Sequence, residues 1–168
     1  HDDEHSHEDE DEHDHDHGAY DPHTWLDPVL MQEMVTHLTE AIVAVDPANA
    51  ATYEANAAAL QADLAALHAD YETALASCAL DEVIVSHDAY GYVADRYGFT
   101  THAIAGLSTQ DQPSATTLAT LRAEAAEGIG AILLEENSIA AYGETLARET
   151  GLTTLPINPI SYAIPDGA

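Results

Sequence analysis

Lysine is absent from this chain, and the only strongly basic side chains are Arg96, Arg122 and Arg148. Against these three cations stand 31 Asp and Glu residues, which bring the formal net charge to -28 over 168 residues. An electrostatic field of this sign repels nucleic acid and anionic lipid headgroups and attracts cations, so nucleic-acid partners and acidic substrates are excluded. Because so many like charges repel one another until salt screens them, the composition also predicts a halophilic source.

Cysteine and long apolar runs are equally scarce. Cys78 is the only cysteine, which excludes an intrachain disulfide and a thiolate-rich zinc site. No apolar run approaches the ~20 residues of a membrane-spanning helix, and no signal peptide or lipid-attachment cysteine precedes His1. From this we expect a protein that is either intracellular or missing its beginning. A Gly-rich phosphate loop, an HExxH motif and a CxxC motif are also absent.

The first 17 residues consist of ten acidic residues, six histidines and one serine. They offer no apolar group whose burial could offset the entropy of ordering the backbone, so we predict a disordered segment over residues 1–18. Spaced imidazoles among carboxylates bind zinc, nickel or copper weakly, since nothing preorganises them. The predicted accessory metal ligands of this loop are His5, His7, His13, His15 and His17.

Two long helices are predicted after the sequence "YDPHTWLDP". Asp27 and Pro28 form a helix start, and apolar residues then recur at helical spacing to Asp46. A second helix is predicted from Pro47 to about Ser77. At 1.5 Å per residue it would be ~45 Å long, more than one small lobe requires. We interpret it as a strut between two bodies.

Beyond Cys78, short apolar runs alternate with helical stretches, which predicts an α/β fold with a parallel sheet of roughly four strands and flanking helices. The expected strands are Glu82–His87, Phe99–Ile104, Gly130–Glu136 and Thr153–Ile157, and the expected helices are Ala89–Tyr97, Ser114–Glu127 and Ser138–Thr150. Ligands of such sheets bind beyond the carboxyl ends of the strands, where His87 is expected to lie.

Two histidines outside the loop are candidate zinc ligands, and each has an ordinary alternative. His87 could hold a metal, since imidazole suits zinc, or it could be a helix-capping or core residue. Asp88 next to it could orient the imidazole or cap the following helix. His23, between two Asp-Pro turns, is as much a candidate turn residue as a ligand.

Taken in order, these segments resemble the zinc/manganese-specific solute-binding proteins of ABC importers, in particular the zinc type of cluster A-I. The similarity covers nearly the whole chain: an acidic His-rich loop, "DPHTWLDP", "DPANAATYEANAAAL", "SHDAYGYVADRYGF", "PSATTL", "LLEENSI" and "NPI". The resemblance implies two α/β lobes joined by a rigid backbone helix, with the metal between them. Residues 19–46 would end the N-terminal lobe, 47–77 would form the backbone helix and 78–168 the C-terminal lobe.

The resemblance also implies a ligand set. His23 and His87 occupy the positions of two family ligands, and manganese-type members usually carry glutamate where His87 stands, which favours Zn²⁺ over Mn²⁺. Asn158 stands where many members have a ligand aspartate. Because an amide oxygen is a weaker zinc ligand than a carboxylate, Asn158 would contact the metal weakly, through water or not at all.

The function implied by the resemblance is the capture of Zn²⁺ outside the cytoplasm, in the periplasm or at the cell surface, and its delivery to an ABC transporter permease. The family's N-terminal lobe, signal sequence, lipid anchor and last helix are not found, so we expect a fragment that meets the membrane only through a missing anchor or the permease. An enzyme is not expected, because no nucleophile motif or pair of catalytic carboxylates is present. The alternatives are an enzyme using His87 and Asp88 as base and orienting group, a metal buffer and a cell-surface adhesin.

Overall fold

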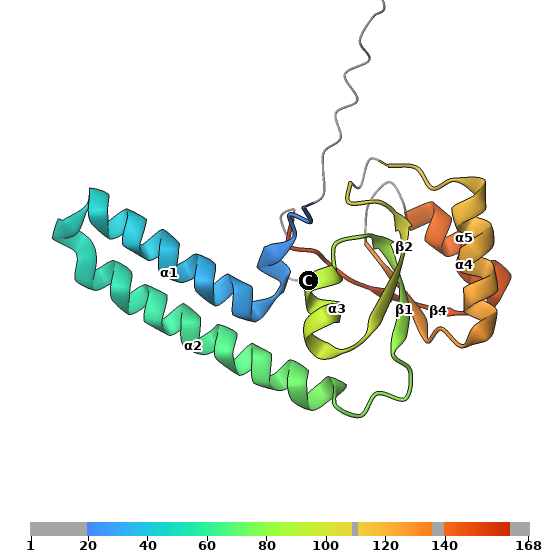
Figure 1. The fold of residues 1–168 in the computed structure, drawn as a ribbon, viewed down its shortest axis with the longest axis horizontal. Coiled ribbons are helices and arrows are strands. Elements are labelled where there is room, and N and C mark those ends of the chain that lie inside the picture. Colours follow the sequence, from blue (N-terminus) through green and yellow to red (C-terminus); the bar gives the residue numbers. More distant parts are fainter. Residues whose placement is uncertain (1–19, 109–110, 136–139, 162–168) are drawn as a thin grey trace, which may run out of the picture.

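A four-stranded parallel sheet forms the centre of the larger of two regions (Figure 1). The computed structural model describes residues 20–108, 111–135 and 140–161. The α/β class and the parallel sheet predicted from the sequence are confirmed. The strands are β1 (Glu82–His87), β2 (Thr100–Ala105), β3 (Ala131–Leu134) and β4 (Thr153–Pro156).

The helices follow the order that the sequence predicts. The described α-helices are α1 (Pro28–Val45), α2 (Ala50–Leu75), α3 (Gly91–Tyr97), α4 (Ala115–Glu127) and α5 (Ala140–Thr150), and two 3-10 turns are η1 (Thr24–Leu26) and η2 (Pro47–Asn49). β1 has the predicted bounds, whereas β2 begins one residue later than predicted. The predicted loop of residues 1–18 lies outside the described residues.

The strand order of the sheet is β2-β1-β3-β4. The chain passes from β1 to β2 on one side of β1, and then crosses to β3 on the other side of β1. The direction of the connections therefore changes between β1 and β3. In open α/β sheets, the crevice beyond the carboxyl ends at such a switch point is the usual ligand site. His87 is the last residue of β1 and therefore lies at this point.

Each face of the sheet has its own hydrophobic cluster. Side chains alternate along a strand, so Ile84 and Val85 of β1 point to opposite faces. Ile84 packs with Ile132, Leu121 of α4 and Leu146 of α5. Val85 packs on the other face with Ala89 and Tyr90. Figure 1 shows α4 and α5 together on one side of the sheet and α3 on the other.

The second region is a hairpin of α1 and α2, which pack along each other and extend away from the sheet (Figure 1). Asp27 caps α1 as predicted, because its side chain accepts hydrogen bonds from the backbone N–H groups of Val29 and Leu30 at 2.8 and 3.2 Å. α2 covers most of the predicted strut, although residues 47–49 form η2 instead of its first turn. No helix among the described residues has the length and apolar character to cross a membrane.

Candidate metal centre

His87 is held at the carboxyl end of the central strand by a carboxylate from the neighbouring strand. His87 is 2% exposed, and its Nδ1 lies 2.7 Å from Oε1 of Glu135, which is itself 1% exposed. Glu135 directly follows β3, and parallel neighbours end at the same edge of the sheet. The Glu135 backbone N–H donates to Ser86 Oγ at 3.0 Å, and the Tyr90 hydroxyl donates to Oε1 at 3.2 Å. The imidazole is therefore fixed from a second strand.

His23 reaches the same point from the loop before α1. It occupies the N-cap position of the 3-10 turn η1, without a side-chain capping bond, and is 5% exposed. Asp21 Oδ1 accepts a hydrogen bond from the His23 backbone N–H at 2.9 Å and lies 2.6 Å from His23 Nδ1. Each candidate ligand histidine thus has a carboxylate on its Nδ1, the arrangement that orients metal-binding imidazoles in proteins.

The two rings face each other through their other nitrogens. His23 Nε2 and His87 Nε2 are 3.3 Å apart, and the ring centroids are 5.1 Å apart. When both Nδ1 atoms donate a proton to their carboxylates, both Nε2 atoms carry lone pairs directed into one space. A cation placed between them would be bound by both.

The separation of these nitrogens fits zinc. Zn–N bonds of about 2.0–2.1 Å at a tetrahedral angle place two ligand nitrogens about 3.3 Å apart. The observed distance between His23 Nε2 and His87 Nε2 is 3.3 Å. The two histidines therefore have the nitrogen spacing of a zinc-chelating pair.

If zinc binds between them, these two imidazoles would supply two of the four positions of a tetrahedral ion. Within residues 20–108, 111–135 and 140–161, no group of three or more His, Cys, Asp or Glu side chains is arranged to hold a metal. A tetrahedral ion bound to the two histidines would therefore need further donors to complete its coordination.

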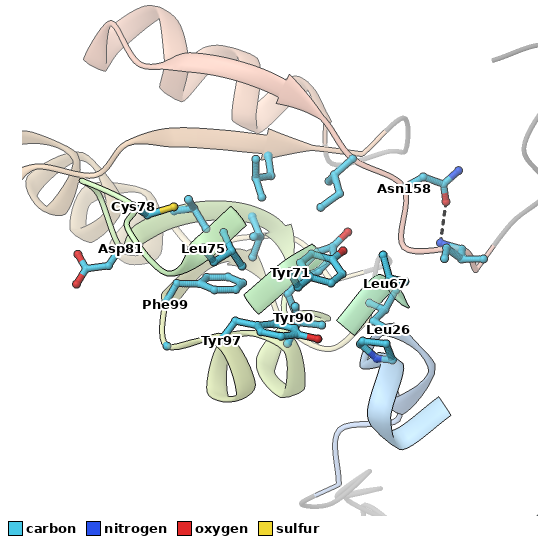
Figure 2. A pocket seen from close by; sticks show the side chains of 18 of the residues that line it. Leu26, Leu67, Tyr71, Leu75, Cys78, Asp81, Tyr90, Tyr97, Phe99 and Asn158 are labelled. Carbon is cyan, nitrogen blue, oxygen red and sulfur yellow. Dashed lines mark hydrogen bonds between the residues drawn. The ribbon is translucent and has the colours of Figure 1, made fainter. Parts of the chain in front are cut away.

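Asn158, the third predicted ligand, has its carbonyl oxygen engaged locally. Asn158 Oδ1 accepts a hydrogen bond from the backbone N–H of Ile160 at 2.7 Å, which closes a turn. Figure 2 shows this bond and places Asn158 at the end of a mostly apolar groove of about 830 Å³. Neither His23 nor His87 lines that groove. Coordination by Asn158 stays a prediction.

Glu135 and Asp21 are the residues of the site that sequence reasoning missed. The third strand was predicted to extend to Glu136, whereas β3 ends at Leu134. Glu135 was therefore treated as a strand residue and not as the first acidic residue after a buried strand. Asp88, considered as the orienting group of His87, is exposed, and Tyr90 occupies the N-cap position of α3. The structure therefore assigns to Glu135 the contact that was considered for Asp88.

Comparison with known proteins identifies the family of this chain. The family described as "ZnuA: Zinc-uptake complex component A periplasmic" matches residues 1–167. The chain belongs to the ZnuA family. ZnuA-type proteins are solute-binding components of zinc transport, so the resemblance read from the sequence is confirmed.

Relatives of known name are also similar over most of the chain. The "High-affinity zinc uptake system protein ZnuA" of Bacillus subtilis is 40% identical over 143 residues, which is 84% of this chain and 45% of that protein. The chain thus spans less than half the length of this ZnuA relative.

Solved structures share the fold. A Zn(II)-bound mutant variant of AdcAII from Streptococcus pneumoniae superposes with a TM-score of 0.79 at 28% identity, over 89% of this chain and 54% of that one. The laminin-binding protein Lmb of Streptococcus agalactiae, described as having adhesin and metal-transporting activity, gives a TM-score of 0.84 at 26% identity, over 89% and 58%. The chain therefore shares the ZnuA-type fold of these proteins over a little more than half of their length.

Proposed function

We propose that His23 and His87 bind one Zn²⁺ as the cargo of a solute-binding protein. The observation that carries the proposal is the 3.3 Å separation of their Nε2 atoms, with each Nδ1 facing a carboxylate. Neutral imidazole is a good ligand for zinc and a poorer one for Mn²⁺, which prefers oxygen donors. The name of the Bacillus relative, a high-affinity zinc uptake protein, supports the same metal.

The proposed task is capture outside the cytoplasm and delivery to an ABC transporter permease, with no covalent step. The family description, a periplasmic component of zinc uptake, supports this location and this partner. No enzymatic activity is part of the proposal. The net charge of -28 would concentrate cations near the surface, which favours metal capture.

The His-rich segment of residues 1–18 is proposed as an accessory to this site. It lies outside the described residues, and the proposal rests on its composition and its attachment just before Asp21 and His23. Weak binding by several imidazoles would raise the local zinc concentration beside the tighter pair. The accessory loop alone would make the protein a metal buffer, so the two sources of binding must be measured separately.

The test is calorimetric titration of the full chain with Zn²⁺ and with Mn²⁺ in molar salt, with and without residues 1–17. His23→Ala and His87→Ala should each weaken one-to-one zinc binding by about 100-fold or more, because each removes half of the chelating pair. His37→Ala is the matched control, since the His37 side chain is 80% exposed on α1. Zinc should bind more tightly than manganese.

Three results separate the alternatives. One-to-one zinc binding that survives removal of residues 1–17 and is lost in His23→Ala or His87→Ala supports the proposal. Binding that disappears only with residues 1–17 identifies a metal buffer and overturns it. Equal losses in His37→Ala and His87→Ala would mean that the paired histidines are not the site.

A further inference from the structure

The position of His23 depends on a short loop that regular secondary structure does not hold. The loop runs from Tyr20 to Asp27, and its 3-10 turn η1 has no side-chain cap. Its register against the sheet is therefore set by bonds to distant residues. Chelation by two imidazoles is sensitive to this register, since a shift of 1 Å would remove the fit to zinc.

Besides the contact between the two histidines, three long-range bonds among the described residues attach this loop to the region that carries His87. The Tyr92 hydroxyl donates to the backbone oxygen of Asp21 at 2.9 Å, and Trp25 Nε1–H donates to the backbone oxygen of Pro159 at 2.8 Å. Arg96 Nε lies 2.7 and 2.6 Å from the two carboxylate oxygens of Asp27. Only the third bond joins two charged side chains.

Asp27 is a buried carboxylate that makes both the ion pair with Arg96 and the bonds that cap α1. It is 1% exposed, and Oδ1 also accepts the backbone N–H bonds that cap α1. A buried carboxylate needs a cationic partner and hydrogen bonds, and removal of the partner leaves an uncompensated charge. Arg96 is one of only three basic residues other than histidine in the chain. The loop and the start of α1 are thus attached to α3 through one ion pair.

We propose that Arg96 is a positioning residue of the candidate metal centre, which acts through Asp27 to hold His23 at chelating distance from His87. The proposal rests on the proposed zinc function. Under this proposal, Arg96 strengthens zinc binding although its own positive charge repels Zn²⁺. A cation near the site repels Zn²⁺, so simple electrostatics predicts tighter binding when Arg96 is removed, whereas positioning predicts weaker binding.

The decisive variants are Arg96→Gln and its matched control Arg122→Gln. Both remove one positive charge, and Arg122 pairs with Glu149 on the exposed outer side of α4 and α5. Calorimetry with zinc alone should show a loss of affinity on the order of tenfold in Arg96→Gln, the lower end of the ~10–100-fold effect of losing a direct partner of a ligand, because Arg96 acts on His23 only through Asp27. Arg122→Gln should keep the wild-type affinity within about twofold.

A second measurement separates positioning from folding. With cobalt(II) bound at saturation, the ligand-field spectrum of Arg96→Gln should differ from that of the wild type, because the geometry of the two imidazoles has changed. In the His23→Ala background, Arg96→Gln should cause no further loss of residual zinc affinity, since its effect passes through His23. Metal-free unfolding curves verify that each variant is folded at the temperature of titration.

If Arg96→Gln does not fold, Asp27→Asn replaces it, because asparagine retains the helix cap and weakens the ion pair. The deciding readouts for this variant are the cobalt(II) spectrum and the His23→Ala background, since loss of a negative charge weakens zinc binding under either reading. An unchanged zinc affinity in a folded variant, or equal losses in the two arginine variants, overturns the positioning role. Failure of the proposed zinc function gives a different result: His23→Ala and His87→Ala would then themselves leave zinc binding intact.

Discussion

The sheet region and the α1–α2 hairpin are stabilised in different ways. In the sheet region, Ile84, Val85 and Ile132 are 0% exposed, and both faces carry buried clusters. In the hairpin, α2 has no buried residue over its 26 positions, and Leu60 and Leu67 are 43% and 44% exposed. The first region is stabilised by burial. The second depends on helix propensity, caps and one seam between two helices.

The candidate metal centre lies where the two regions meet. His87 belongs to the rigid sheet, while His23 belongs to the loop that leads into α1. The two candidate ligands are therefore held differently: His87 is packed within the sheet region, whereas the placement of His23 depends on a few polar bonds. A metal held by both would connect the two regions, and the following predictions test the contrast between them.

The largest effect is expected for Ile132→Ala in the middle of β3. The substitution leaves a cavity beneath a side chain that is 0% exposed, so we expect a loss of ~2–5 kcal/mol in the free energy of unfolding. Chemical denaturation followed by circular dichroism in molar salt measures it. Leu60→Ala in α2 is the counterpart and should cost less than ~1 kcal/mol, since the side chain is half exposed and alanine favours helix. Similar losses in the two variants would refute the contrast.

An intermediate effect is expected for Tyr97→Phe at the junction. Tyr97 stacks on Tyr71 of α2 at a ring-centroid distance of 4.9 Å, and its hydroxyl lies 3.0 Å from His68 Nδ1. Phenylalanine keeps the stacking and removes the polar bond, so a loss of ~0.5–1.5 kcal/mol is expected on unfolding. An unchanged midpoint of denaturation would show that the hydroxyl adds nothing to the junction.

The same substitution has a pH signature. Burial, followed by the Asp27 charge, raises the pKa of Tyr97 above its usual value of 10.0. A raised folded-state pKa means that the stabilisation is fully present below pH ~10 and is lost as the pH rises through the folded-state pKa. The decline of wild-type stability with pH above ~10 should therefore be shallower in Tyr97→Phe. An unchanged slope would assign the decline to other groups.

The smallest effect is expected at the tip of the hairpin. Hydrogen bonds from the Asn49 side chain at 2.8 Å and the Tyr53 hydroxyl at 2.7 Å lower the pKa of Asp46 below its ordinary value. Its contribution is therefore present above the unfolded-state pKa of about 3.9 and is lost as the pH falls through the folded-state pKa. Carboxyl NMR titration should show a higher Asp46 pKa in Tyr53→Phe than in the wild type. Equal values would mean that the Tyr53 bond does not form in solution.

Much of the fold could be predicted from local signals. The Asp27-Pro28 and Asp46-Pro47 pairs mark helix starts because a short acceptor side chain and a preset proline φ act within one turn. β1 was predicted with its observed bounds, since its three consecutive apolar residues, Val83–Val85, are typical of a buried strand. α3 begins two residues later than predicted because Ala89 and Tyr90 pack on Val85 before the helix starts, and no local signal encodes that packing.

The sequence by itself determined the elements, the parallel sheet, the family and the two histidines, because periodicity, caps and motif order act over a few residues or are read along the chain. Only the tertiary structure decided what those histidines touch. Glu135 lies 48 positions from His87, His23 lies 64 positions from His87, and Arg96 lies 69 positions from Asp27. Such contacts depend on which strands end side by side and how a loop crosses them. A long-range packing arrangement, which no local pattern records, therefore determines the geometry of the proposed zinc site.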